Sequence, residues 1–136
     1  MLTKILPSIF QKIVFCKPFH KTTMELQEEI EGKVVLLSFI GSFLGETEGV
    51  IVVDAVNDYL ADGYTDFVID MHQLEHINSA GLSVLINVND KIKKAQGTLT
   101  LTQMNERVHK LFKITKLDTV FNIQNSTKEV IKKLNE

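Results

Sequence analysis

Cysteine is nearly absent from this sequence. Cys16 is the only cysteine among its 136 residues, so an internal disulfide framework is excluded. A chain without disulfides suits a reducing compartment, so we expect a cytoplasmic location. Hydrophobic residues make up 44% of the chain and charged residues 24%, the proportions of an ordinary globular protein. A chain of this length can bury a core without covalent cross-links.

Long apolar runs and a strong excess of charge are also missing. No stretch of about 18 apolar residues occurs, so the sequence predicts no membrane-spanning helix. The formal net charge is −2, which gives no reason to expect direct binding to nucleic acid. A soluble globular domain is therefore the expected class.

The first 23 residues differ in composition from the rest of the chain. They contain four lysines, no acidic residue and both prolines. They make a poor signal peptide, because Lys12 interrupts the apolar stretch and no small-residue cleavage site follows. Apolar residues at helix-like intervals would permit contact with a membrane surface, but end segments of this kind are more commonly untethered. We expect residues 1–23 to form a flexible tail and residues 24–136 to form the working domain.

Strands and helices are expected to alternate after residue 24. Residues 24–31 and 33–40 predict two strands joined by a turn at Gly32–Lys33. Four helices are expected, at 45–63, 79–97, 105–117 and 126–136. Three more strands are expected, at 65–71, 98–104 and 120–123. This order implies right-handed crossovers between parallel strands. We predict a single α/β domain with a mixed, mostly parallel sheet of about five strands and about four helices.

Apolar residues at helical spacing define the expected inner faces of two helices. In residues 79–97 the face consists of Leu82, Leu85, Ile86, Asn89 and Ile92. In residues 105–117 it consists of Val108, Leu111, Phe112 and Leu117. Asn105 and Ser126 are expected to cap the last two helices, the second with Glu129 in a capping box.

Residues 72–76 read His-Gln-Leu-Glu-His, the H-x-x-E-H spacing of one class of zinc peptidase. Two histidines four residues apart share a zinc ion only when a helix presents them on one face. Here the motif follows an expected strand and precedes an expected helix. We therefore predict that it lies in a connecting loop, with His72 and His76 exposed and Leu74 and Ile77 as apolar anchors. A third ligand is missing, so we predict no metal site.

The stretch Asn-Ser-Ala-Gly-Leu at 78–82 opens an expected helix. A helix N-terminus carries backbone N–H groups without partners and the positive end of the helix dipole, so it accepts a phosphate well. Asn78 or Ser79 could be the N-cap. Phosphorylation of Ser79 would add a charge of about −1.5 to −2 that a docked partner would not tolerate without arginines. The simpler interpretation is that the serine only caps the helix.

No set of catalytic residues is recognisable. Cys16 lies in the expected tail, and no histidine is matched to a serine by spacing. The glycine-rich stretch 41–49 lacks the Gly-Lys-Ser/Thr ending of a phosphate-binding loop, and we interpret its glycines as turn residues. We expect no enzyme activity and no cofactor.

Several motifs occur in the order found in a known protein family. An aspartate ends a strand, two apolar anchors follow, and a small-residue segment opens a helix. Between about residues 24 and 124 the chain resembles the STAS domains, and in particular the bacterial anti-sigma factor antagonists. The residues that carry the resemblance are Asp70, Leu74, Ile77, Asn78 to Leu82, Gly97, and the R-V-x-K-L-F-x-I-T-x-L helix from Arg107 to Leu117.

The resemblance implies a way of working. In the family, a serine in an Asp-Ser-Ser/Thr-Gly motif is phosphorylated by a kinase that is also an anti-sigma factor, and phosphorylation ends binding. For this chain it implies phosphorylation at Ser79, an anti-sigma factor and serine kinase as partner, and a serine phosphatase that reverses the reaction. The implied partner-binding residues are Asp70, Asn78, Ser79, Ala80, Gly81 and Leu82.

Two residues depart from the family motif. Asn78 replaces the aspartate, which removes a charge, and Ala80 replaces a second hydroxyl that is the acceptor in some members. If Ala80 occupies the acceptor position, the chain cannot be switched in this way. The resemblance then implies an alternative function, as a non-phosphorylated STAS adaptor in a transport or stress-signalling complex.

Overall fold

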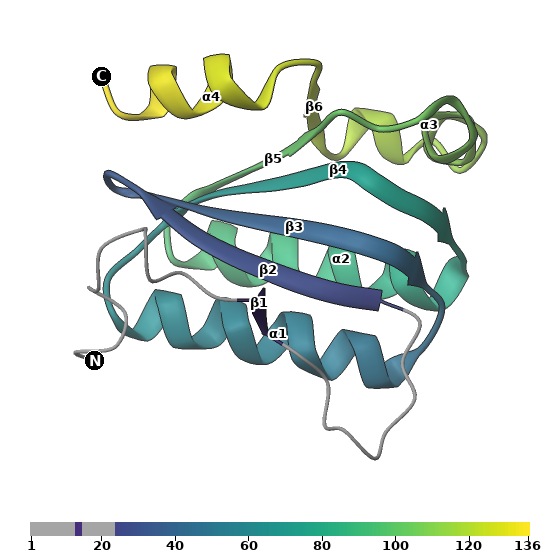
Figure 1. Cartoon of the computed structure of the whole chain (residues 1–136), viewed down its shortest axis with the longest axis horizontal. Helices are drawn as coiled ribbons and strands as arrows, with labels where there is room; N and C mark the ends of the chain where they lie inside the picture. Colours follow the sequence, from purple (N-terminus) through teal and green to yellow (C-terminus); the bar gives the residue numbers. More distant parts are fainter. Residues whose placement is uncertain (1–12, 15–23) are drawn as a thin grey trace.

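The structure is a computed structural model that describes residues 13–14 and 24–136. Within these residues, six strands form one sheet in the order in which they follow along the chain (Figure 1). The strands are β1 (Ile13–Val14), β2 (Met24–Glu31), β3 (Val34–Phe43), β4 (Asp66–Ile77), β5 (Thr98–Thr102) and β6 (Asn122–Gln124). The helices are α1 (Glu46–Ala61), α2 (Ser79–Lys94), α3 (Glu106–Ile114), the short 3-10 helix η3 (Leu117–Thr119) and α4 (Thr127–Leu134). Strands β1 to β3 pair antiparallel and β3 to β6 pair parallel, which confirms the predicted α/β fold with a mixed sheet.

The predicted flexible tail falls almost entirely outside the described residues. Of residues 1–23, only Ile13 and Val14 are described, and they pair with Gln27 and Leu26 of β2. The flexibility of this segment and its contact with a membrane surface therefore stay predictions.

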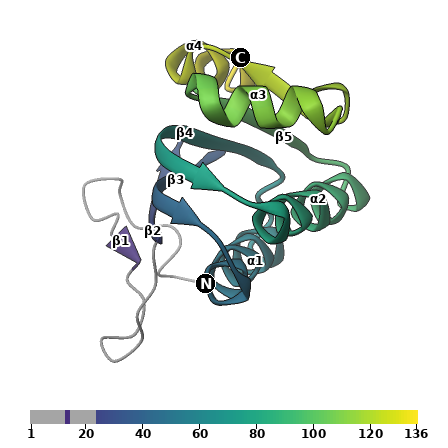
Figure 2. The same cartoon turned by 90° about the vertical axis from the view of Figure 1, so that its right-hand side faces the viewer.

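Helices cover both faces of the sheet. Figures 1 and 2 place α1 and α2 on one side and α4 on the other. The central strands β3 and β4 are buried on both faces, as parallel strands between helical layers should be. Leu37, Phe39 and Ile69 belong to the main core, which includes residues of α1 and α2. Val34 and Val68 face the opposite way and pack with Val130, Ile131 and Leu134 of α4.

The turn between β2 and β3 confirms the predicted hairpin. Glu31 pairs with Val34, so Gly32 and Lys33 form a two-residue loop. Gly32 has φ +66, the left-handed conformation that the first position of a type II′ turn requires. The Asn135 side chain holds this turn from the far end of the chain. The Lys33 N–H donates to Asn135 Oδ1 over 3.0 Å, and Asn135 Nδ2 donates to the Glu31 carbonyl over 3.0 Å.

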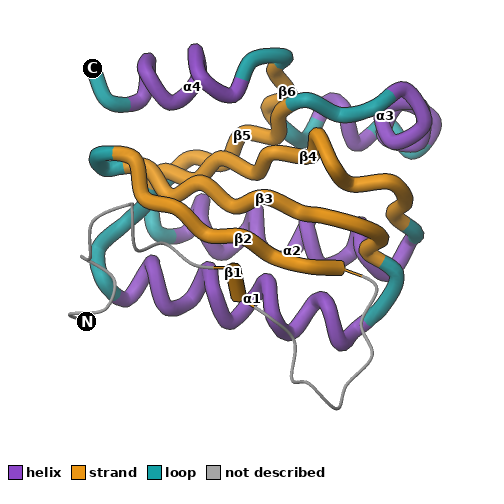
Figure 3. The backbone as a smooth tube through the Cα atoms, viewed as in Figure 1, coloured by secondary structure: helices purple, strands orange, loops and turns teal. Residues whose placement is uncertain are grey.

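Strand β4 is longer than predicted, and the expectation that residues 72–76 form a loop is wrong. These residues continue the strand and pair with β3 up to the pair Phe43–Ile77 (Figure 3). The register between β3 and β4 shifts twice in this stretch, and each shift leaves one extra residue on β4. Two such bulges break the alternation of sides. Met71, Leu74 and Ile77 consequently all point into the core, three residues apart, while the residues between them are exposed.

Helix α2 packs against both the sheet and α1. Its buried residues are Gly81, Leu82, Leu85, Val88, Asn89 and Ile92. The prediction that Ile86 lies on the inner face is wrong, because Ile86 is 36% exposed while Val88 is fully buried. Helix α1 approaches α2 closely, because a Cβ on Gly49 would lie 2.7 Å from Cγ2 of the half-buried Val84.

The predicted caps of the last two helices are confirmed. The Val108 N–H donates to Asn105 Oδ1 over 2.8 Å at the start of α3, and the Glu129 N–H donates to Ser126 Oγ over 3.2 Å at the start of α4. Asn105 Nδ2 also donates to the Leu74 carbonyl over 2.9 Å. This second bond holds the start of α3 against the bulged end of β4.

Candidate functional site at the start of helix α2

Asn78 is the residue that fixes the start of α2. It is the N-cap, and the Gly81 N–H donates to its Oδ1 over 3.0 Å. Its Nδ2 donates to the Leu44 carbonyl over 2.9 Å, and its backbone N–H donates to the Phe43 carbonyl over 3.3 Å. One side chain therefore caps the helix and ties it to the connection between β3 and α1. Because Asn78 is the cap, the interpretation of Ser79 as a mere capping residue is wrong.

Ser79 is the first residue of α2 and is exposed. Within the described part of the chain its hydroxyl makes no hydrogen bond. The first turn of α2 contains no acidic residue. An anion on this hydroxyl would therefore meet the positive end of the helix dipole without repulsion from the first turn.

The three residues after Ser79 turn progressively inward. Ala80 is half-buried, and Gly81 and Leu82 are buried. Gly81 lies so close to the strand ends that a Cβ would come within 2.7 Å of the Phe43 carbonyl oxygen and of Ile77 Cγ1. Of the predicted docking residues 78–82, Asn78 and Ser79 thus supply most of the accessible surface.

Leu44 belongs to the same end of the molecule and was missed by the sequence reasoning. It is 42% exposed and precedes Gly45, the N-cap of α1, and its carbonyl accepts a hydrogen bond from Asn78 Nδ2. Nothing in the local sequence links it to Ser79, because the pairing of Phe43 with Ile77 brings the two segments together.

The structure does not place Asp70 with these residues. Asp70 lies on the face of β4 that is covered by α4, opposite the face covered by α2. Its Oδ1 accepts the His72 N–H over 2.8 Å, and its Oδ2 accepts the Thr127 hydroxyl over 3.2 Å. Thr127 in turn lies 2.6 Å from the Thr102 hydroxyl. These bonds give the Asp70 carboxylate an internal role in joining α4 to the sheet.

The two histidines of the H-x-x-E-H motif lie on a strand rather than a helix. Both histidines are exposed, as predicted. His76 lies beside Arg107 of α3, and the distance between Arg107 Nη1 and His76 Nδ1 is 3.3 Å. The helical geometry that zinc peptidases of this class require is therefore not formed. Among the described residues, no three His, Cys, Asp or Glu side chains gather as metal ligands would.

Across residues 13–14 and 24–136, no helix is both long enough and apolar enough to cross a membrane.

Comparisons with known proteins agree on the family. The model of the STAS domain matches residues 22–130. A Thermotoga neapolitana protein, described as a candidate anti-sigma factor antagonist, is 27% identical over 78 residues, which cover 57% of this chain and 69% of that protein.

Solved structures share the fold. The crystal structure of a candidate anti-sigma factor antagonist from Thermotoga maritima has a TM-score of 0.71 at 24% identity, covering 82% of this chain and 95% of that one. The anti-sigma factor antagonist SpoIIAA in its unphosphorylated form has a TM-score of 0.64 at 14% identity, covering 80% and 96%. SpoIIAA of Bacillus has also been solved in its phosphorylated form. Because the family model spans most of the sequence, this chain belongs to the STAS domain family.

Proposed function

We propose that this protein is an anti-sigma factor antagonist whose binding is switched by phosphorylation of Ser79. It binds an anti-sigma factor that is also a serine kinase, and the phosphorylated form releases it. The chain itself performs no catalysis, and a serine phosphatase restores the binding form. The observation that carries the proposal is an exposed serine at the first position of α2, in a STAS domain, with no hydrogen bond from its hydroxyl to any described residue.

The position of Ser79 favours a switch that leaves the fold intact. A phosphoserine carries about −1.5 to −2 charges at neutral pH. At the first turn of α2 this charge is favourable by about 0.3–1 kcal/mol, because the helix dipole is positive there. The docked partner, in contrast, would have to desolvate the phosphate or offer arginines to it. Phosphorylation thus weakens the complex without destabilising the domain.

The structure explains how Asn78 can replace the aspartate of the family motif. Oδ1 accepts the Gly81 N–H while Nδ2 donates to the Leu44 carbonyl. An aspartate could make the first bond but not the second, because a carboxylate has no hydrogen to donate. The amide therefore keeps the cap and adds a tie to the neighbouring connection. The replacement of the family aspartate leaves Ser79 in a helix start that is fully formed.

The experiment compares three variants with wild type in binding to a kinase-type anti-sigma factor encoded in the same genome. Ser79→Ala should bind like wild type and resist phosphorylation. Ser79→Asp should bind more weakly. Asn87→Asp is the matched control, because Asn87 is exposed on the same helix about two turns later, so the same added charge lies away from the docking end. Titration calorimetry measures affinity, and peptide mass mapping locates the phosphate; equal affinities for Ser79→Ala and Ser79→Asp would refute the switch.

A second candidate function is a non-phosphorylated adaptor, and Ala80 is the observation that favours it. Ala80 has no hydroxyl at a position that is the acceptor in some members of the family. An adaptor would never carry a phosphate. Its Ser79→Ala and Ser79→Asp variants would bind the partner complex with equal affinity. Mass mapping of the protein purified from its own cells therefore distinguishes the two functions.

A further inference from the structure

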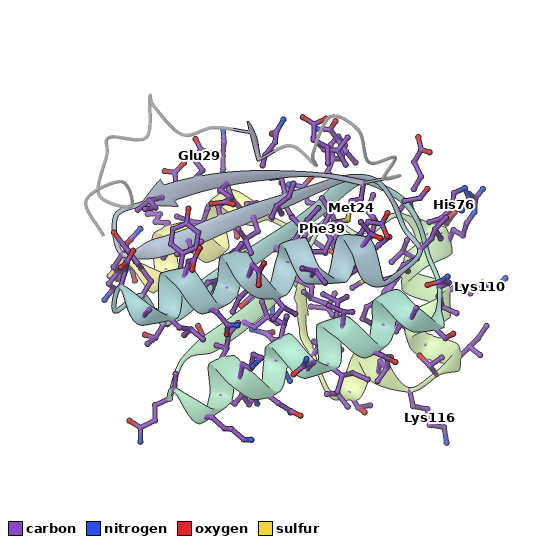
Figure 4. The ribbon with its side chains drawn as sticks, turned by 90° about the horizontal axis from the view of Figure 1, so that it is seen from below. Met24, Glu29, Phe39, His76, Lys110 and Lys116 are labelled. Carbon is purple, nitrogen blue, oxygen red and sulfur yellow. The ribbon has the colours of Figure 1, made fainter. Side chains whose placement is uncertain are left out.

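A groove lies beside the docking end of α2, between the bulged end of β4 and helix α3. Residues of both elements line it. They include His76, Ile77, Arg107, Lys110, Lys113 and Ile114. Asn105 positions α3 there through its bond to the Leu74 carbonyl. Figure 4 shows His76 and Lys110 at the same end of the molecule, both directed outward.

The groove is basic in a chain that is acidic overall. Residues 106–116 contain four of the 15 basic residues and only one of the 17 acidic residues. Arg107, Lys110 and Lys113 are all exposed. Within the described residues, none of these three side chains forms an ion pair. Glu75 and Glu106 also line the groove, but its three cations outnumber these two carboxylates, so a net positive charge remains available to an acidic ligand.

The same face of α3 also carries apolar side chains that are not fully buried. Val108 and Phe112 point into the core, but Leu111 is only half-buried and Ile114 is 70% exposed. Arg107, Leu111 and Ile114 follow one another at helical spacing and form one stripe. With Ile77 they border a hollow of about 220 Å³. This hollow can accept an inserted apolar side chain.

We propose that this groove binds an acidic amphipathic segment of a partner protein. Carboxylates of the segment pair with Arg107, Lys110 and Lys113, and an apolar residue enters the hollow beside Ile114. The combination argues for a peptide, because a free anion would not use the apolar hollow and a purely apolar segment would leave the cations unpaired. Ser79 does not line the groove, so this inference does not rest on the phosphorylation switch.

The test uses a fluorescein-labelled synthetic helix of roughly 18 residues, with leucines along one face flanked by glutamates. Fluorescence anisotropy should show saturable binding to the full chain. Arg107→Glu with Lys110→Glu should weaken binding about tenfold, since two exposed ion pairs are lost. Ile114→Ser should weaken it about fivefold through the lost apolar contact. Circular dichroism confirms that each variant is folded.

Matched controls separate the groove from general attraction between charges. Lys128→Glu with Lys132→Glu makes the same change of charge on exposed positions of α4 and should alter affinity less than about twofold. A peptide with lysines in place of the glutamates should not bind. Ser79→Asp should leave peptide binding nearly unchanged, so that failure of the groove and failure of the switch are distinguishable. Absence of saturable binding, equal binding of the lysine peptide, or equal losses in the two double variants would overturn the proposal.

Discussion

Gly81 offers a sharp test of how α2 is seated, because a single added methyl group meets backbone there. In Gly81→Ala the new Cβ would lie 2.7 Å from the Phe43 carbonyl oxygen and 2.7 Å from Ile77 Cγ1. The carbonyl belongs to the end of β3 and already accepts the Asn78 N–H over 3.3 Å. Relief of the clash therefore requires α2 to move away from the sheet and weakens that bond.

The expected cost follows from three contributions. Overpacking of this kind costs about 1–3 kcal/mol. Loss of the Asn78 backbone hydrogen bond costs about 1 kcal/mol. Replacement of glycine by alanine inside a helix stabilises the helix by about 1 kcal/mol. The net loss in the free energy of unfolding should be about 1–3 kcal/mol, or roughly 3–10 °C in Tm for a domain of this size.

Gly49→Ala is the matched control, since Gly49 also lies in a helix and its Cβ would also meet an atom at 2.7 Å. That atom is Val84 Cγ2, a side-chain methyl group rather than backbone, although the valine side chain is itself stiff at χ1 in a helix. The gain in helix propensity offsets about 1 kcal/mol of an overpacking cost of about 1–3 kcal/mol, and no backbone hydrogen bond is lost, so Gly49→Ala should cost less stability than Gly81→Ala. Urea unfolding followed by circular dichroism measures both variants. If Gly81→Ala is as stable as Gly49→Ala, the described seating of α2 is wrong.

Three further changes test other parts of the structure. Asn78→Ala should destabilise the domain by about 1–2 kcal/mol in urea unfolding, because the cap and the tie to the β3–α1 connection are lost together; an unchanged midpoint would contradict the cap. Asn135→Ala should cost about 1–2 kcal/mol through its two bonds to the β2–β3 turn, with amide exchange of Lys33 accelerated; unchanged exchange would contradict those bonds. Burial, with Glu31 nearby, raises the pKa of Glu29 above its ordinary value of 4.5. Ionisation of Glu29 therefore costs stability as the pH rises through that raised pKa. The Glu29→Gln variant should have a higher Tm than wild type at pH 7 and no advantage below about pH 4. A lower Tm of the variant at pH 7 would refute this.

Periodicity predicted the order of the elements because each strand and helix carries a strong local pattern. The caps at Asn105 and Ser126 were predictable for the same reason, since a cap is decided by residues within one turn. The fold class followed from the alternation of strands and helices. These features depend on short stretches of sequence.

The end of β4 could not be predicted from periodicity. Two bulges there place Met71, Leu74 and Ile77 on one side, three residues apart, a spacing that fits neither a regular strand nor a regular helix. The pairing partner β3 decides this conformation. The same long-range pairing brings Leu44 to the start of α2, so its place at the candidate site was also hidden from local patterns.

The candidate site itself was predicted in part. Ser79 lies at an exposed helix start, as the small-residue segment indicated. Asp70 was grouped with it only through the family motif, whereas side-chain alternation along β4 turns its carboxylate toward Thr127 on the opposite face. Ile114 was given no role from the sequence, because its place in the groove depends on the packing of α3 against β4.

The affinity of the unmodified and the Ser79-phosphorylated protein for the anti-sigma factor kinase is the most direct test of the proposed switch. Both forms can be prepared from the same chain and titrated by calorimetry against the same partner. A buried charge without a compensating group costs a complex about 2–5 kcal/mol, so the phosphorylated form should bind at least about 30-fold more weakly. Equal affinities of the two forms would contradict the account.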